Sequence, residues 1–266
     1  MQTKIRLPWK AIILILAAAL VLAALLAKPG YYLYRELEYK YGHPTKSEQL
    51  VYAYAETTGI PYGAYPKDLI ALLDTSPEAR CFVLDYPVRE ETAVDLSNYS
   101  QETVPLFLQW DPMWGYENYG SSYLAVTGCG PTCLAMAGYY LTGEETMNPL
   151  TVAEFAEKSG YYARGYGSSW TLISEGAEKL GLTATELPLV KKKMVRALEA
   201  GNPVILALGK GDFTSTGHYI VLTGVEEEGF RVNDPNSREN SKKLWTYEQL
   251  EGQIRNIWEI SVGAGY

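Results

Sequence analysis

The residue of this chain best suited to nucleophilic chemistry is a cysteine flanked by glycines. Cys129 lies in the sequence Gly-Cys-Gly-Pro-Thr at residues 128–132, and the residues that follow are apolar and compatible with a helix. Proline in a first turn, with glycine nearby, is typical of a helix start. The free N–H groups and the dipole at a helix N-terminus favour a thiolate, the nucleophilic form of cysteine. The alternative is a small, packed cysteine beneath a turn.

The second candidate is a histidine at the beginning of an apolar, β-branched run. His218 opens the segment 218–224, which predicts a central strand. The chain has two histidines, and the other one, His43, precedes a proline in a polar stretch and is expected on the surface. A lone histidine at a strand start is usually structural, but any cysteine–histidine pair in the body must use His218.

An aspartate follows at the end of the next predicted strand. Residues 225–229 are an acidic turn that ends in glycine, so residues 218–225 and 230–234 are predicted to form an antiparallel hairpin. The turn lies midway between His218 and Asp234, which brings these residues together across the hairpin. Asp234 could then accept a hydrogen bond from the imidazole and fix its orientation. A plain Asp-Pro-Asn turn is the alternative.

Cysteine acyl transfer also needs hydrogen-bond donors for the developing oxyanion. The side-chain amide of Gln109 and the backbone N–H of Cys129 would serve this purpose. From composition alone, however, Gln109 is no more than an exposed polar residue.

The three cysteines, Cys81, Cys129 and Cys133, leave at least one thiol without a partner in the chain. Cys133 lies one helical turn after Cys129 and is expected in the core. A disulfide between these two stays open as an alternative; it would block the nucleophile. Residues 81–84 are expected to form a short buried strand or core anchor, with Cys81 as a buried small hydrophobe and not a reactive group. With no Cys-x-x-Cys pair and no histidine cluster, we expect no metal site.

The elements that must position these groups predict an α+β domain. Helices are expected at residues 151–160, 170–180 and 190–201, and strands at residues 203–208, 218–225, 230–234 and 257–262. Helices followed by antiparallel strands form an α+β arrangement. The cleft is expected between the Cys129 helix and the sheet.

The N-terminus predicts a membrane segment. Residues 11–27 are an unbroken apolar run, and Lys4, Arg6 and Lys10 precede it. The run barely reaches the length of a membrane span and slightly exceeds a signal-peptide core, so an uncleaved signal anchor is favoured over a cleaved signal peptide. A buried core helix is the third alternative. The basic flank is expected to stay in the cytoplasm, which places the body outside the cell membrane, or secretes it if the segment is cleaved.

Residues 1–30 are thus predicted as a signal anchor or signal peptide, 31–103 as a stalk and small helical region, and 104–266 as the main body. The formal net charge is −8, and the first thirty residues carry four basic side chains and no acidic one. The body is therefore strongly acidic. An acidic body argues against a nucleic-acid partner, because phosphate binding needs clustered lysine and arginine.

In combination and order, the motifs resemble the peptidase family thirty-nine-like domain. This group is related to the bacteriocin-processing cysteine peptidases and more broadly to papain-like folds. The resemblance covers residues 104–260. It rests on Gln-Trp-Asp at 109–111, Gly-Cys-Gly-Pro-Thr at 128–132, Gly-His-Tyr-Ile at 217–220 and Asn-Asp-Pro-Asn at 233–236.

The resemblance implies a papain-like fold and hydrolysis of peptide amide bonds through a thioester, with no cofactor. By resemblance, Cys129 is the nucleophile, His218 the base, Asp234 the group that orients it, and Gln109 a part of the oxyanion hole. The implied partners are a peptide or protein substrate and, through the N-terminal segment, the membrane. Two alternatives stay open: a cell-wall peptide amidase with the same residues, and a non-catalytic surface binding module on the same fold.

Overall fold

The computed structural model describes residues 9–165 and 167–263, and its contacts divide the chain into two compact units, Met1–Pro66 and Lys67–Tyr266. Two residues of the predicted basic flank, Lys4 and Arg6, lie outside the described residues. The predicted domain boundaries at residues 30 and 103 stay predictions.

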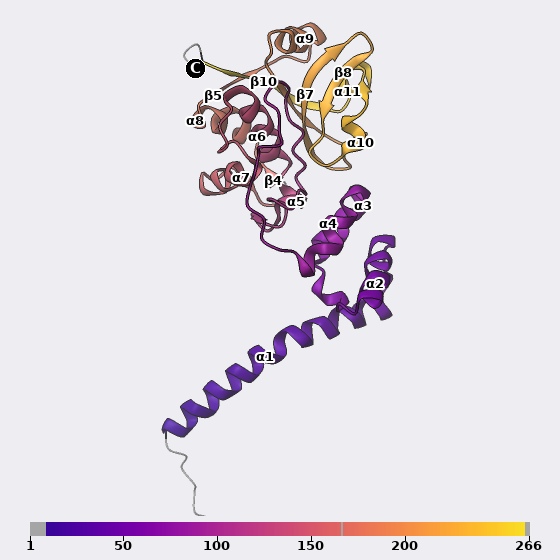
Figure 1. The fold of residues 1–266 in the computed structure, drawn as a ribbon, viewed down its shortest axis with the longest axis vertical. Coiled ribbons are helices and arrows are strands. Elements are labelled where there is room, and N and C mark those ends of the chain that lie inside the picture. Colours follow the sequence, from indigo (N-terminus) through magenta and orange to yellow (C-terminus); the bar gives the residue numbers. More distant parts are fainter. Residues whose placement is uncertain (1–8, 166, 264–266) are drawn as a thin grey trace, which may run out of the picture. The chain divides into compact units, whose positions relative to one another are not determined.

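The first unit is built around one long helix (Figure 1). Its helices are α1 (Trp9–Tyr41), α2 (Lys46–Thr58) and the short η1 (Tyr62–Ala64). The 33 residues of α1 run without a break through Pro29, so the stalk expected after the apolar run is a continuation of the same helix. At about 1.5 Å per residue, α1 is about 50 Å long, well beyond the ~30 Å hydrocarbon core of a bilayer.

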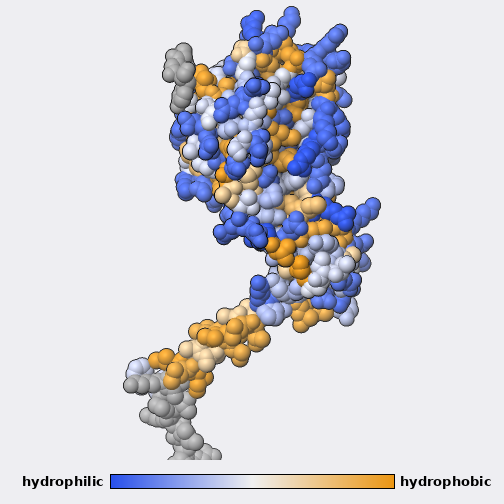
Figure 2. All heavy atoms as spheres, viewed as in Figure 1, coloured by the Kyte–Doolittle hydropathy of each residue, from blue (hydrophilic) through white to orange (hydrophobic). Residues whose placement is uncertain are grey.

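The N-terminal half of α1 has an apolar surface (Figure 2). Among the described residues, one helical segment, Ile13–Tyr41, is long and apolar enough to cross a membrane, and its most apolar stretch is not covered by protein. The C-terminal half of α1 is covered instead by its own unit. There the buried Arg35 side chain donates to the carbonyl of Tyr65 at 3.2 Å, and the rings of Tyr39 and Tyr52 stack with centroids 3.9 Å apart.

The second unit contains the elements that carry the candidate chemistry. Its helices are α3 (Lys67–Thr75), η2 (Pro77–Ala79), α4 (Arg80–Asp85), η3 (Tyr86–Val88), α5 (Leu124–Thr127), α6 (Cys129–Thr142), α7 (Pro149–Lys158), the π-helical η4 (Leu172–Gly176), α8 (Ala177–Lys179), α9 (Lys191–Glu199), α10 (Arg238–Ser241) and α11 (Tyr247–Glu251). Its strands are β1 (Asn118–Tyr119), β2 (Ser122–Tyr123), β3 (Tyr162–Ala163), β4 (Gly167–Ser168), β5 (Leu182–Glu186), β6 (Val204–Leu208), β7 (His218–Glu226), β8 (Gly229–Asn233), β9 (Leu244–Trp245) and β10 (Ile254–Val262).

An antiparallel six-stranded sheet in the order β5-β10-β6-β7-β8-β9 forms the centre of this unit. One face packs on α6 and α7, through residues such as Tyr219 and Val221 of β7. The other face packs on α9 and α11, through Ile220 and Leu222 of the same strand. Strand β7 lies between β6 and β8 in the middle of the sheet (Figure 1). Because helices cover both faces of the sheet, the first five residues of β7 are buried.

The predicted α+β class is confirmed, with a helix that begins at Cys129 packed on an antiparallel sheet and an apolar helix at the N-terminus. The four predicted strands and the helices at 151–160 and 190–201 are present. Two predictions are wrong. Residues 81–84 are helical in α4, and residues 170–180 contain a π-helical turn and the short α8 instead of one regular helix. Strand β5 was not predicted.

Candidate active site

Cys129 is the first residue of α6, as the glycine–proline pattern predicts. Gly128 precedes it as the cap, and Pro131 lies in the first turn, where a missing N–H costs no helical hydrogen bond. The Thr132 hydroxyl donates to the carbonyl of Gly128 at 2.7 Å, which closes this turn. Cys129 is partly exposed, whereas the ten residues after it are buried. The thiol therefore lies at the surface end of a buried helix.

Glycine at position 130 is required by the neighbouring β3–β4 hairpin. A Cβ at Gly130 would lie 2.7 Å from the Cβ and Oγ of Ser168. The Ser168 hydroxyl is hydrogen-bonded to that of Tyr119 at 2.7 Å, and its carbonyl accepts from Tyr219 at 3.3 Å. The β3–β4 hairpin thus packs directly against the helix start that bears Cys129.

His218 opens β7 and is buried, with 9% of its surface exposed. Its Nε2 lies 2.7 Å from Oδ1 of Asp234. The strand register explains this contact: Val221 pairs with Asn233, so Asp234 lies opposite Ile220, two residues from His218 on the same strand. Because Nε2 is occupied by Asp234, Nδ1 is the imidazole nitrogen left for another partner, and the Cys129 side chain is among the groups that raise the pKa of His218.

The charges of these groups are coupled. Burial opposes the charge on His218, but the carboxylate of Asp234, its hydrogen bond and the Cys129 side chain outweigh burial and raise the pKa of His218 to about 10. Burial likewise opposes the charge on Asp234, yet the His218 cation and hydrogen bonds from Asn240 and Asn236 hold the pKa of Asp234 below its usual range. At neutral pH, the pair is an imidazolium next to a carboxylate.

Asp234 is held by more partners than sequence reasoning identified. Its Oδ1 also accepts from the backbone N–H of Asn236 at 2.9 Å, and its Oδ2 accepts from the side-chain amide of Asn240 at 2.8 Å. Its backbone N–H donates to the hydroxyl of Ser241 at 2.9 Å. Asn240 and Ser241 lie in α10, after the predicted turn, and Asn236 lies in the turn itself. A polar run, Asn-Ser-Arg-Glu-Asn-Ser at 236–241, was their one signal in the sequence.

Gln109 is 3% exposed, which corrects the exposed position that composition alone gives. Its backbone N–H donates to the carbonyl of Pro235 at 2.8 Å, and its Nε2 donates to the carbonyl of Ala125 at 2.6 Å. Gln109 therefore connects the loop of Asp234 to the segment that leads into Cys129. One hydrogen of its amide nitrogen stays available, and its Oε1 is buried without a hydrogen-bond partner.

All three cysteines are free thiols, so Cys129 and Cys133 are not joined in this structure. Cys133 is buried as predicted, and burial raises the pKa of its thiol well above the usual value. Cys81 is exposed on α4, which overturns its predicted burial. The cause is the helix itself, which turns Phe82, Val83 and Leu84 inward and Cys81 outward. His43 is exposed, as expected.

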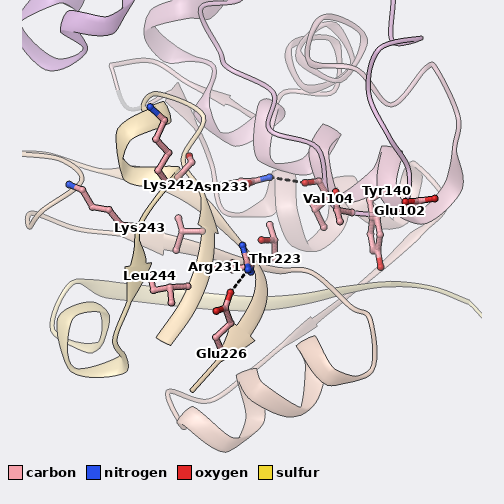
Figure 3. Close-up of a pocket in the computed structure, with 13 residues that line it drawn as sticks. Glu102, Val104, Tyr140, Thr223, Glu226, Arg231, Asn233, Lys242, Lys243 and Leu244 are labelled. Atoms are coloured by element: carbon pink, nitrogen blue, oxygen red, sulfur yellow. Dashed lines mark hydrogen bonds and ion pairs between the residues drawn. The ribbon is translucent and has the colours of Figure 1, made fainter. Parts of the chain in front are cut away.

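Two cavities lie near these elements. A polar pocket of about 560 Å³ is lined by an ion pair between Glu226 and Arg231 and by Asn233, which donates to the carbonyl of Val104 (Figure 3). Neither Cys129 nor His218 lines it. A smaller, mainly apolar pocket of about 280 Å³ has Gln109 in one wall and α3 in another. Among residues 9–165 and 167–263, no group of three or more His, Cys, Asp or Glu side chains could hold a metal ion.

Comparison with known proteins gives a match to the model of the Peptidase_C39 like family over residues 101–266. The search among curated proteins gives no match. Among solved structures, the chain is similar to the peptidase domain of Streptococcus ComA, described as a bi-functional ABC transporter involved in a quorum-sensing pathway. That likeness has a TM-score of 0.40 and 21% identity, and covers 52% of this chain and 93% of that one. A putative C39-like peptidase from Bacillus anthracis gives a TM-score of 0.35 and 18% identity, over 59% of this chain and 94% of that one.

Proposed function

Because this chain belongs to the Peptidase_C39 like family, we propose that it is an active cysteine peptidase, anchored by α1 with its body outside the cell membrane. The observation that carries the proposal is the position of His218 between two groups. Asp234 is hydrogen-bonded to Nε2, Nδ1 is left for a second partner, and the Cys129 side chain acts on the imidazole closely enough to raise its pKa. A cysteine, a histidine and an orienting carboxylate in this order are the components of thiol acyl transfer.

The proposed reaction is hydrolysis of a peptide amide bond in two steps. The Cys129 thiolate attacks the carbonyl carbon, and His218 gives its proton to the leaving amine as the C–N bond breaks. A water molecule then attacks the thioester, its proton passes to His218, and the acid product leaves as the C–S bond breaks. The Cys129 backbone N–H and the free amide hydrogen of Gln109 donate to the oxyanion in both steps.

Membrane anchoring is supported by the single apolar segment of α1. A segment of about 20 residues spans the hydrocarbon core, so roughly the last third of α1 lies beyond it. This C-terminal part is the one that its own unit covers, with Arg35 buried. The basic residues before the apolar run favour a cytoplasmic N-terminus and an outer body.

The proposal is tested with purified full-length protein and a library of fluorogenic peptides. Wild type should release fluorophore, and Cys129→Ala should abolish release while leaving circular dichroism unchanged. Cys133→Ala is the matched control, because its thiol lies one turn further along the same helix and is expected to be dispensable for the chemistry. Hydrolysis that survives Cys129→Ala would end the proposal. Cleavage of cell-wall peptides but of no linear peptide would favour the amidase alternative.

A further inference from the structure

The loop that carries Asp234 is held from outside by a segment that the family match does not include. Residues 234–241 form their own network, in which Ser241 donates to the carbonyl of Ser237 at 2.7 Å and Asn240 donates to Asp234. This network fixes the loop internally. Contacts from other parts of the second unit place the loop: the Gln109 N–H donates to the carbonyl of Pro235, the Trp110 indole donates to the carbonyl of Asn236 at 3.1 Å, and segment 67–88 adds further bonds.

Two side chains from the helical segment 67–88 contact this loop. The hydroxyl of Ser76 donates to the carbonyl of Asn236 at 2.8 Å. The carboxylate of Glu78 accepts three hydrogen bonds: from the Ser237 hydroxyl at 2.7 Å, and from the backbone N–H groups of Arg238 at 3.1 Å and Glu239 at 3.3 Å. A carboxylate that accepts several such bonds forms charge-assisted hydrogen bonds, which are stronger than neutral ones.

The segment that presents these side chains is itself fastened to the body. The ring of Phe82 stacks on that of Tyr116 with centroids 4.0 Å apart, and the Tyr116 hydroxyl donates to the carbonyl of Phe82 at 2.7 Å. Ser76 is 2% exposed, and its backbone N–H donates to the carbonyl of Leu72 at 2.7 Å, which ends α3. Ser76 and Glu78 are therefore held on a packed element, and they can transmit its position to the loop.

We propose that Ser76 and Glu78 are positioning residues for Asp234, so that the helical segment 67–88 forms part of the active site. This inference rests on the proposed function. Glu78 contacts Ser237, Arg238 and Glu239 and does not touch the reacting atoms; it acts by holding the loop from which Asp234 reaches His218. A displacement of about 1 Å at a catalytic constellation can lower the rate about a hundredfold.

The charges around Glu78 define the appropriate control. Arg238 lies over the ring of Trp110 with its guanidinium 4.5 Å from the centroid, and Lys242 is paired with Glu239 at 2.6 Å. Glu239 lies on the short helix α10, next to Arg238. Its carboxylate is exposed and makes no bond to the loop of Asp234. Glu239→Gln therefore removes one negative charge close to Glu78, together with the exposed ion pair to Lys242. It keeps the hydrogen bonds that Glu78 accepts from the loop.

The test compares Glu78→Ala, Glu78→Gln, Ser76→Ala and Glu239→Gln in the full chain. The first readout is the rate at which iodoacetamide alkylates Cys129 across the pH range, with the site assigned by peptide mapping. The second is kcat and KM on the best peptide, and the third is the melting temperature. Displacement of Asp234 from His218 weakens the main interaction that opposes burial and so disfavours the His218 cation, and the alkylation profile should move to higher pH.

We expect Glu78→Ala and Ser76→Ala to lower the rate of Cys129 alkylation below neutral pH. They should also lower kcat by about ten- to a hundredfold, with KM nearly unchanged. Glu78→Gln, which keeps one acceptor oxygen, should lie between Glu78→Ala and wild type. Glu239→Gln should match wild type. A wild-type pH profile and kcat in folded Glu78→Ala and Ser76→Ala would overturn the inference. If those variants do not fold, Glu78→Gln decides, and a wild-type profile there would overturn it. Failure of the proposed function is distinguishable, because it would appear in the wild-type protein. There, the alkylation rate of Cys129 would have the same pH dependence as that of the exposed Cys81.

Discussion

The His218 Nε2 atom lies 2.7 Å from Oδ1 of Asp234, and both side chains are buried. This contact leaves Nδ1 for Cys129 and keeps the imidazole charged across the neutral range, because its pKa is raised to about 10. A charged imidazole beside a thiol favours the thiolate. Under the proposed function, we therefore expect the contact between His218 and Asp234 to control whether Cys129 acts as a nucleophile.

The first prediction concerns Asp234→Asn. Without the carboxylate, only the interaction with Cys129 opposes burial, so the pKa of His218 should fall and the imidazolium should be less favoured. Alkylation of Cys129 by iodoacetamide in wild type should be faster below neutral pH than alkylation of the exposed Cys81. In Asp234→Asn it should follow ordinary thiol behaviour, and peptide hydrolysis should fall about 10⁴-fold.

The built-in reference for this measurement is Cys81, which is exposed on α4 and should alkylate like an ordinary thiol in both proteins. Cys133 should stay unlabelled, since it is fully buried. Equal pH profiles for Cys129 and Cys81 in the wild-type protein would contradict the activation of Cys129.

The second prediction separates two roles of Gln109. If its free amide hydrogen binds the oxyanion, Gln109→Ala should lower kcat about 10²- to 10³-fold with little change in KM. Alkylation by iodoacetamide forms no oxyanion, so its rate at Cys129 should stay near that of wild type. Parallel loss of alkylation and hydrolysis would instead assign Gln109 a structural role, through its bonds to Ala125 and Pro235.

How far the sequence predicts this site depends on the range of each interaction. The helix start at Cys129 and the hairpin that joins His218 to Asp234 follow from local rules: glycine and proline at a helix N-terminus, and period-two strands around a turn. These elements lie where the pattern predicts them.

The parts that the sequence did not predict depend on contacts over long sequence separations. Gln109 is buried because its backbone bonds Pro235, 126 residues later, and Ser76 reaches Asn236 across 160 residues. No periodicity records such contacts. Cys81 was misplaced for a different reason: four residues, Cys-Phe-Val-Leu, are too few to distinguish a strand from a helical turn.

The third prediction concerns the side of the membrane on which the body lies. In a Cys129→Ala background, the remaining thiols are the exposed Cys81 and the buried Cys133. A membrane-impermeant maleimide added to intact cells should label the protein, and Cys81→Ser should abolish the label. Labelling that requires permeabilised cells would place the body in the cytoplasm and would contradict the predicted topology.

The fourth prediction is a pH-dependent stability that follows from the same ion pair. The pKa of His218 is raised on folding, so its stabilising contribution is complete below the unfolded value of about 6.5 and is lost as pH rises through about 10. The pKa of Asp234 is lowered, so its contribution is complete above the unfolded value of about 3.9 and is lost on acidification. Both contributions are therefore complete between about pH 4 and 6.5.

Urea unfolding of wild type and Asp234→Asn at about pH 5.5 and 9.5 measures this effect. The difference in unfolding free energy between the two proteins should shrink at the higher pH by more than about 1.4 kcal/mol, the equivalent of one pKa unit. Glu239→Gln removes an exposed carboxylate and should differ from wild type equally at both pH values. A difference for Asp234→Asn that is constant or larger at the alkaline pH would mean that His218 is uncharged in the folded protein, and the thiolate of Cys129 would then lack its cation.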